Sequence, residues 1–265
     1  MGKPRIKIAS VFYKNPSVPV KEQKFKEEHV YRMYEQIRDN TTKKFDFYCL
    51  TNSDELSHPN IKTIKLDDAY KGWFAKMRLF DPKIFASGRI FYIDLDMSIL
   101  KNIDDILTFQ GDLCMCKDAH YEAEYWSNII LFDAAKCHFI YKNFKQQEWR
   151  TTMSFLSSPS IPASGDQNWI NALCSTKTGS DPKTQKIKDL LALPPQGAYF
   201  LNSQSTPNPL PRKHLIVDLP SQWFPSAKKR KNDRWELINL DDLSPEAKIL
   251  VYHGEPAPWE REKYK

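Results

Sequence analysis

The chain has 265 residues, of which 41% are hydrophobic and 27% are charged, so it can bury one large core and is not disordered. Glycine is scarce, with eight residues, and the two nearest in sequence are Gly165 and Gly179. Dinucleotide fingerprints, Walker loops and serine-hydrolase elbows need glycines a few residues apart, so all three are excluded. The net charge of +6 favours an anionic ligand or surface. No zinc finger, arginine-rich arm or aromatic RNA motif accompanies this charge, and no nucleic-acid partner is expected.

The cysteines and the lengths of the apolar runs indicate the cellular compartment in which the protein is expected. The five cysteines are odd in number and include an apolar-flanked pair, Cys114 and Cys116, which argues against a disulfide framework and for a reducing compartment. No apolar run approaches the ~18 residues that span a bilayer, and the N-terminus lacks a secretory signal core. We therefore expect a cytoplasmic enzyme, of a microbe or of a virus-infected host cell. Its basic surface would still allow peripheral contact with a membrane.

The first part of the chain alternates strand and helix patterns. A β-rich run predicts a strand at 6–12, helical apolar spacing predicts a helix at 25–37, and two further β-rich runs predict strands at 45–50 and 61–66. A helix is predicted at 73–80, because the pattern stops before Pro82. The segment 89–100 is the strongest strand candidate. Its apolar stretch at 90–93 is unbroken, which is typical of a central strand buried on both faces.

The rest of the chain continues the alternation. Strands are predicted at 112–117, 128–132 and 248–252, and helices at 134–149 and 166–174. Residues 194–225 are rich in Pro, Ser and Asn, and are predicted to form an ordered, meandering stretch. The alternation of strand and helix patterns along the chain predicts an α/β fold. We expect a single domain in which helices cover both faces of a mixed, mostly parallel central sheet.

Two aspartates follow the central apolar run. Residues i and i+2 of a strand share a face, so Asp94 and Asp96 are predicted to project together at its end. Open α/β sheets bind ligands at the carboxyl ends of their strands. Two adjacent carboxylates repel each other unless a cation lies between them, and Mg²⁺ or Mn²⁺ prefers such oxygen ligands. Such an ion could hold a diphosphate without a glycine loop. The alternative is that both aspartates are solvated turn residues.

The same pattern is compatible with a haloacid-dehalogenase-like phosphatase. These enzymes place Asp-X-Asp-X-Thr/Ser after an apolar strand, and residues 94–98 fit, with Asp94 as nucleophile and Asp96 as general acid. In those enzymes the motif normally opens the domain. Here about 90 residues precede it, and a later acidic pair for Mg²⁺ is not evident.

Several motifs together point to another class of enzyme. The sequence resembles the GT-A fold glycosyltransferases of the glycogenin-like, family 8 type and their bacterial and viral relatives. The resemblance covers most of the chain and rests on six segments in the order typical of that family: Cys-Leu-Thr-Asn at 49–52, the Trp-Phe-Ala-Lys segment at 72–80, Asp-Leu-Asp at 94–96, Ser-Asn-Ile-Ile-Leu-Phe at 127–132, Gly-Asp-Gln at 165–167 and His-Gly-Glu-Pro-Ala-Pro-Trp at 253–259.

The resemblance implies one GT-A domain over residues 1–265, with its nucleotide-binding part at about 1–118 and its acceptor side at about 119–265. It implies Mn²⁺ or Mg²⁺ as cofactor, bound by Asp96 and His253, with Asp94 contacting the metal or the ribose. The other residues that it implies for binding the nucleoside diphosphate sugar are Ala9, Ser10, Val11, Leu95 and Gly254.

The resemblance also implies three catalytic residues. Asp166 and Gln167 would lie at a helix N-terminus and face the donor sugar or the acceptor, and Asp166 could be the N-cap residue as well. Lys76 would point toward the phosphates or the sugar; the alternative is a solvated helix lysine. An inverting reaction would need a general base, for which Asp118, Glu122 and Asp166 are candidates.

The sequence departs from the family pattern in two places. Ala257 stands where the family often has a lysine that neutralises the diphosphate, so another cation, such as the basic run 228–231, would have to replace it. Trp126 stands where many relatives have Asn, which bears on sugar selection. The expected function is metal-dependent transfer of a sugar, from a UDP-sugar by preference, to a glycan or other hydroxyl acceptor. The alternatives are the phosphatase and a non-catalytic protein that binds glycans or polyanions.

Overall fold

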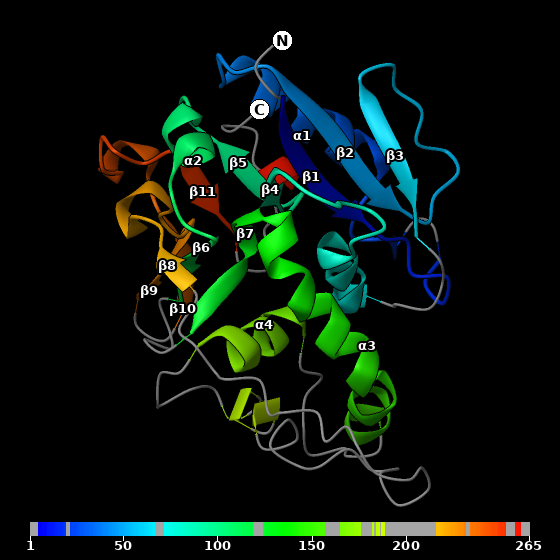
Figure 1. Cartoon of the computed structure of the whole chain (residues 1–265). Helices are drawn as coiled ribbons and strands as arrows, with labels where there is room; N and C mark the ends of the chain where they lie inside the picture. Colours follow the sequence, from blue (N-terminus) through cyan, green and yellow to red (C-terminus); the bar gives the residue numbers. More distant parts are fainter. Residues whose placement is uncertain are drawn as a thin grey trace, which may run out of the picture.

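The central feature of the computed structural model is one seven-stranded sheet with helices on both faces (Figure 1). The structure describes residues 5–19, 22–66, 72–118, 124–156, 165–175, 216–231, 234–252 and 258–260, and five positions between 182 and 188. In these segments strands and helices alternate along the chain, as the sequence predicts. The strands of the main sheet are β1 (Ile6–Phe12), β2 (Phe45–Thr51), β3 (Ile61–Lys65), β4 (Arg89–Ile93), β6 (Leu113–Lys117), β7 (Tyr125–Asp133) and β8 (Ile216–Asp218).

The sheet is mixed and mostly parallel, which confirms the predicted fold class. Its strand order is β3-β2-β1-β4-β7-β6-β8. Strand β7 runs antiparallel to both of its neighbours, β4 and β6, while the other pairs are parallel. Strand β3 forms one edge of the sheet. Because β1 and β4 are parallel neighbours, their carboxyl ends lie side by side. Ligands of α/β sheets bind at such strand ends, and the pocket described below lies there.

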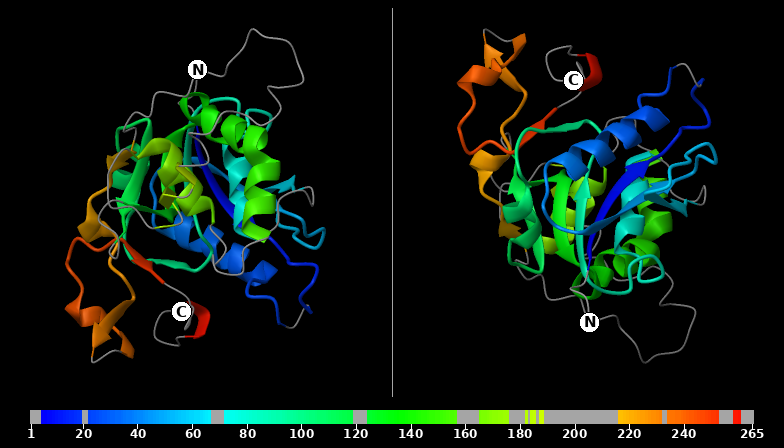
Figure 2. Two further views of the ribbon diagram at one scale, coloured as in Figure 1. Left: turned by 90° about the horizontal axis from the view of Figure 1, so that it is seen from below. Right: turned by 90° about the horizontal axis from the view of Figure 1, so that it is seen from above.

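The remaining elements surround this sheet (Figures 1 and 2). The longer helices are α1 (Glu27–Asp39), the 3-10 helix η2 (Gly72–Phe80), α2 (Asp104–Thr108), α3 (Ala134–Leu156) and α4 (Asp166–Cys174). Two small antiparallel sheets pair β5 (Met97–Ile99) with β11 (Ile249–Val251) and β9 (Lys228–Lys231) with β10 (Arg234–Leu237). Three short 3-10 turns complete the described part: η3 (Ser221–Trp223), η4 (Leu240–Asp242) and η5 (Pro258–Glu260).

Each face of the sheet has its own hydrophobic core, and β4 contributes to both. Phe91 and Ile93 belong to the cluster that α1 and α2 cover, whereas Ile90 and Tyr92 belong to the cluster that η2, α3 and α4 cover. Alternate residues of a strand point to opposite faces, so a strand between two cores is apolar without a break. This is the physical reason for the pattern at 90–93, and it places β4 in the middle of the sheet.

The predicted strand 89–100 is wrong in its length. The chain leaves the main sheet after Ile93 and forms a turn, and it resumes as β5, which pairs with β11 in a different sheet. The backbone N–H of Asp94 still donates to the Asn128 carbonyl at 2.9 Å, which is the last bond between β4 and β7. Asp94 and Asp96 therefore lie on a turn, and the pleat of a single strand does not hold them to one face.

Other segments also differ from the predictions. The predicted helix at 73–80 is a 3-10 helix, and the predicted helix 134–149 continues to Leu156. The predicted meandering stretch 194–225 lies outside the described residues up to 215, and its remainder contains β8 and η3.

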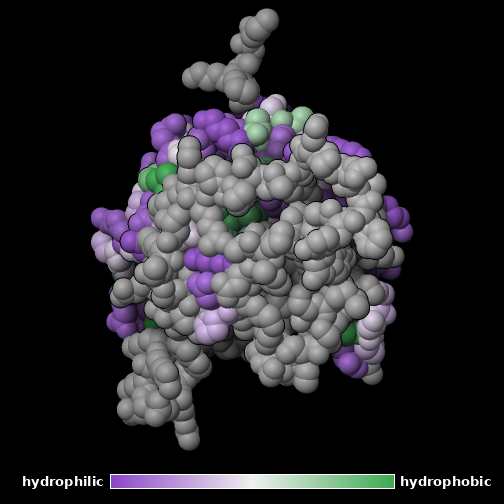
Figure 3. All heavy atoms as spheres, turned by 60° about the horizontal axis from the view of Figure 1, so that its bottom comes forward, coloured by the Kyte–Doolittle hydropathy of each residue, from purple (hydrophilic) through white to green (hydrophobic). Residues whose placement is uncertain are grey.

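The described surface is mainly polar. Among the described residues, Val217 is the one large hydrophobic side chain classed as exposed, at 40%, and the described rim of the face in Figure 3 is largely hydrophilic. No helix in the described segments is long and apolar enough to cross a bilayer. All five cysteines are buried and carry free thiols, as expected for a protein without a disulfide framework.

Candidate functional site

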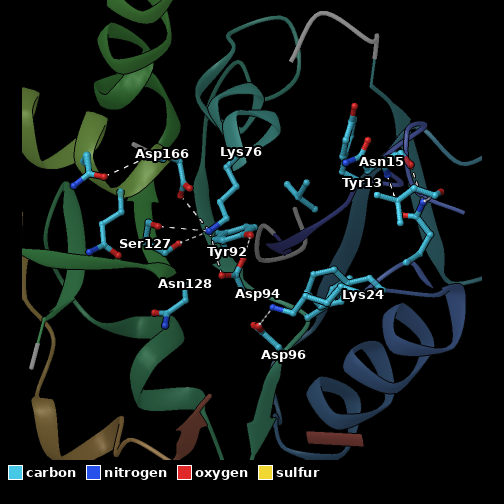
Figure 4. A pocket seen from close by; sticks show the side chains of 18 of the residues that line it. Tyr13, Asn15, Lys24, Lys76, Tyr92, Asp94, Asp96, Ser127, Asn128 and Asp166 are labelled. Atoms are coloured by element: carbon cyan, nitrogen blue, oxygen red, sulfur yellow. Dashed lines mark hydrogen bonds and ion pairs between the residues drawn. The ribbon is translucent and has the colours of Figure 1, made fainter. Parts of the chain in front are cut away.

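A pocket of about 660 Å³ opens where β1 and β4 end. Its walls come from the end of β1 and the loop that follows, from the turn after β4, from β7, and from the N-terminus of α4 (Figure 4). Four carboxylates line it, from Glu22, Asp94, Asp96 and Asp166, and two lysines, Lys24 and Lys76. The pocket therefore combines several charged groups with apolar side chains, and it lies where α/β sheets bind ligands.

Lys76 lies at the centre of the buried side of this pocket. Its Nζ is 3.1 Å from Oδ2 of Asp94 and 3.1 Å from Oδ2 of Asp166, and it also donates to the backbone carbonyl of Ser127 at 3.4 Å (Figure 4). Burial lowers the pKa of Lys76, but the two carboxylates outweigh it, so the net pKa is raised and the ammonium form is stable. The alternative of a solvated helix lysine is therefore wrong: the lysine is buried and paired.

Asp94 is held by groups on both sides of its carboxylate. One oxygen faces Lys76, and the other accepts a hydrogen bond from the Tyr92 hydroxyl. Burial raises the pKa of Asp94 to about 6, with further contributions from the Asp96 and Asp166 carboxylates and against the opposing effect of Lys76. An additional cation placed near such a carboxylate would stabilise its ionised form.

Asp96 lies on the other side of the turn and has a different partner. Its Oδ2 is 2.8 Å from Nζ of Lys24, which reaches across from the loop after β1 (Figure 4). The turn itself is fixed by Arg32 of α1, whose guanidinium donates to the carbonyls of Leu95 at 2.8 Å and Met97 at 3.0 Å. The side chain of Asp96 is therefore directed into the pocket by backbone contacts that do not involve its carboxylate.

The N-terminus of α4 brings two more polar side chains to the pocket. Gly165 is the N-cap of this helix and Asp166 is its first residue, so Asp166 is not the N-cap as the alternative for it supposes. Asp166 is instead committed to Lys76, and the Gln167 amide donates to Asp118 at 3.0 Å. Asp166 lies in the first turn of α4, where the helix dipole favours a negatively charged side chain.

Some of the described residues could act as ligands of a divalent metal ion. Asp94 and Asp96 line one pocket together with Asn128 of β7, whose buried side-chain oxygen has no hydrogen-bond partner. Carboxylate and amide oxygens fit Mg²⁺ or Mn²⁺. No group of three or more His, Cys, Asp or Glu in the described segments could hold a metal by itself. His253 and Gly254 lie outside the described residues, directly after β11, whose Val251 pairs with Met97 beside Asp96.

The structure brings most of the predicted site residues together. Those that line the pocket are Val11, Lys76, Asp94, Leu95, Asp96, Asp166 and Gln167. Ala9 and Ser10 do not line it: Ala9 is buried in the sheet core, and the buried Ser10 hydroxyl donates to the Ile93 carbonyl at 2.8 Å. Position along β1 explains the difference, because the strand is still enclosed at positions 9 and 10 and only its end reaches the pocket. Glu122, a candidate base, and Ala257 lie outside the described residues.

Sequence reasoning missed several residues of the pocket. Tyr92 was counted only as core, although its hydroxyl reaches Asp94, and Asn128 was noted only as part of a motif. Lys24 and Asn15 come from the loop after β1, which carries no motif. Asn128 comes to the pocket because its strand pairs with β4 and places it opposite the position where β4 ends, which only the structure shows.

Comparison with known proteins identifies the fold. A structure of an active-site mutant of LgtC superposes with a TM-score of 0.57 and 12% identity, over 97% of this chain and 90% of that one. The galactosyltransferase LgtC in complex with donor and acceptor sugar analogs gives a TM-score of 0.51 over the same shares. The chain has the GT-A fold. The structure of the glycosyltransferase GlyE of Streptococcus pneumoniae TIGR4 also superposes on this chain, with a TM-score of 0.52 and 11% identity, over 97% of this chain and 57% of GlyE. Neither a family model nor a curated protein matches the sequence.

Proposed function

We propose that this GT-A protein is a glycosyltransferase that moves a sugar from a nucleoside diphosphate sugar, by preference a UDP-sugar, to a hydroxyl group of a glycan or another acceptor. The observation that carries the proposal is the pocket at the ends of β1 and β4, where Asp94, Asp96 and Asp166 converge in a fold shared with glycosyltransferases. The pocket volume of about 660 Å³ suits a ligand of nucleotide-sugar size.

The proposal assigns a task to each group of side chains. Asp94 and Asp96, with His253, would hold Mn²⁺ or Mg²⁺, which when bound stabilises negative charge on the departing nucleoside diphosphate. Lys76 pairs with Asp94 and Asp166 and fixes both carboxylates at 3.1 Å from its own ammonium group. Asp166 and Gln167 would orient the hydroxyl groups of the donor sugar or the acceptor, because rigid carboxylate and amide oxygens bind hydroxyls directionally.

The remaining parts of the proposal concern the base and the compartment. Val11 would contact the nucleoside base, because it lies at the end of β1 and lines the pocket. Leu95 and Gly254 would complete the donor site. The cytoplasm is the proposed compartment, and the five buried free thiols support it, since such thiols persist in a reducing environment.

The proposal is tested by thermal unfolding with nucleotides. UDP, GDP and dTDP are each added with Mn²⁺ and with a chelator, to the wild type and to Asp96→Ala. A ligand at ~100 times its dissociation constant adds about 2.7 kcal/mol of stability, a shift of several degrees for a chain of this size. We expect one nucleotide, UDP, to raise the midpoint only with metal, and we expect Asp96→Ala to abolish the shift.

The control is Asp54→Ala, which removes an exposed aspartate that pairs with Lys65 outside the pocket. It should leave the metal-dependent shift unchanged. A shift of equal size in chelator would refute metal dependence. No shift with any nucleotide would favour the phosphatase, which a phosphoester hydrolysis assay would detect, or a binding protein without turnover. No observation in the described segments favours either of these two alternatives.

A further inference from the structure

Lys24 places a positive charge at the mouth of the pocket. It belongs to the loop between β1 and α1, and its Nζ reaches Oδ2 of Asp96 at 2.8 Å (Figure 4). The Lys24 side chain is 53% exposed, whereas the Asp96 side chain is 11% exposed. A mostly buried carboxylate is thus paired with a lysine whose side chain is about half exposed.

The loop that carries Lys24 is held in place by its own hydrogen bonds. The Gln23 amide donates to the carbonyls of Asn15 at 2.7 Å and Val18 at 2.6 Å, and its oxygen accepts from the Asn15 N–H at 3.0 Å. The base of the loop is fixed by Asn52, which exchanges two hydrogen bonds of 2.8 Å with the backbone of Lys14. The described residues directly before Lys24 are therefore held in place.

The two lysines of the pocket differ in their freedom to change partner. Lys76 is buried and bound by two carboxylates, so moving it would leave Asp94 and Asp166 unpaired in the interior. In the described structure Lys24 has one carboxylate partner, Asp96, and its ammonium group also lies 4.9 Å from the centre of the Phe25 ring. A long, flexible, half-exposed lysine can move to a new anion at little cost.

We propose that Lys24 exchanges partners when the site is loaded: it gives up Asp96 to a divalent cation and takes the diphosphate of the nucleotide donor as its new partner. This inference rests on the proposed function and deepens it. A cation at Asp96 would repel the ammonium group, and the phosphates would then be the nearest anions. The chain has no closely spaced glycines to bind phosphate through backbone amides, so a mobile lysine supplies the needed positive charge.

If Lys24 exchanges partners, replacing it should change the affinities for Mn²⁺ and for UDP in opposite directions. Without Lys24 a metal ion meets no competitor at Asp96, so Lys24→Gln should bind Mn²⁺ alone roughly three-fold more tightly. The same variant lacks a phosphate contact, so it should bind UDP in saturating Mn²⁺ about ten-fold more weakly. Uridine, which has no phosphate, should bind the variant and the wild type equally.

The experiment measures Mn²⁺ binding by electron paramagnetic resonance, and UDP and uridine binding by calorimetry, on folded protein. Lys24→Arg keeps the charge and should restore UDP binding to within about two-fold of the wild type. Lys136→Gln is the matched control, because Lys136 is 58% exposed and pairs with a single carboxylate, Asp112, away from the pocket. It should change neither affinity.

The outcomes separate this inference from the proposed function. Wild-type protein that binds no UDP in saturating Mn²⁺ overturns the proposed function, and the inference with it. Wild-type binding that Lys24→Gln leaves unchanged overturns the inference alone. Weaker binding of both Mn²⁺ and UDP to Lys24→Gln would show a structural role for Lys24, and would also overturn the exchange.

Discussion

Lys76 carries its charge inside the protein, between two carboxylates. Lys76→Met would leave Asp94 and Asp166 buried without their cation, and breaking a buried pair costs about 3–5 kcal/mol. We expect the free energy of unfolding to fall by about this amount at pH 7, measured by urea unfolding. Adding Asp166→Asn to the variant should recover part of the loss, because it removes one of the two unpaired charges.

The control for this prediction is Lys136→Met. Lys136 and Asp112 are both more than half exposed, and an exposed pair contributes about 0–1 kcal/mol. If the two methionine variants lost equal stability, the Lys76 cluster would contribute no more than a surface ion pair.

His29 of α1 couples stability to pH. It stacks on Trp259 with ring centroids 3.7 Å apart, and burial lowers the pKa of His29 from 6.5 to about 4. A group with a lowered folded-state pKa contributes stability that is present above pH 6.5 and is lost as the pH falls toward 4, here by up to about 3 kcal/mol. We expect His29→Phe, which keeps an aromatic ring, to lose less stability than the wild type over this range in urea titrations. Equal losses would mean that His29 does not cause the pH dependence.

Single residues of the site were predictable where a strand end or a helix start determines their place. Asp94, Asp96 and Asp166 follow such positions in the sequence, and all three line the pocket. Lys24 was not predictable, because its place depends on the path of a loop that hydrophobic periodicity does not describe. The resemblance implied that Ser10 binds the donor, but its side chain is buried and its hydroxyl donates to the Ile93 carbonyl.

At the scale of elements, the break between β4 and β5 shows what an apolar pattern predicts and what it leaves open. The unbroken run at 90–93 correctly indicated a central strand, because it reports burial on both faces. It could not indicate where the strand ends, because that depends on its partners: β7 pairs with β4, whereas β11 pairs with β5. The same limit applies to η2, where the apolar spacing is similar for an α-helix and a 3-10 helix.

The loop after β1 offers a test at this scale. Gln23→Ala removes the acceptor of the Asn15 N–H and two further hydrogen bonds within the loop. We expect hydrogen exchange at the Asn15 amide to become at least about ten-fold faster, because its bond is lost and the loop opens locally. The Lys14 amide is the internal control, since it donates to Asn52 and should keep its rate. Unchanged exchange at Asn15 would show that Gln23 does not order the loop.

The whole molecule encloses its thiols within the two cores. Burial raises the pKa of Cys116 and of Cys137 to about 12, and it also raises the pKa values of Cys49, Cys114 and Cys174. The thiolate is the reactive form, so the native protein should react with a thiol reagent at least about 100-fold more slowly than the urea-unfolded protein, in which five thiols react. A thiol that reacts quickly in native protein would reveal local opening of the core around it.

The sheet has an open flank along β3, since in the described part of the chain only β2 pairs with it. Free N–H and C=O groups on such a flank can recruit the sheet of another molecule. Lys62 and Lys65 of this strand are exposed and pair with Asp46 and Asp54, so a second copy brought alongside would meet charged, hydrated side chains. Charged side chains on an edge strand oppose its pairing with another sheet, and concentrated salt, which screens such charges, is the condition under which we expect folded molecules to begin to associate.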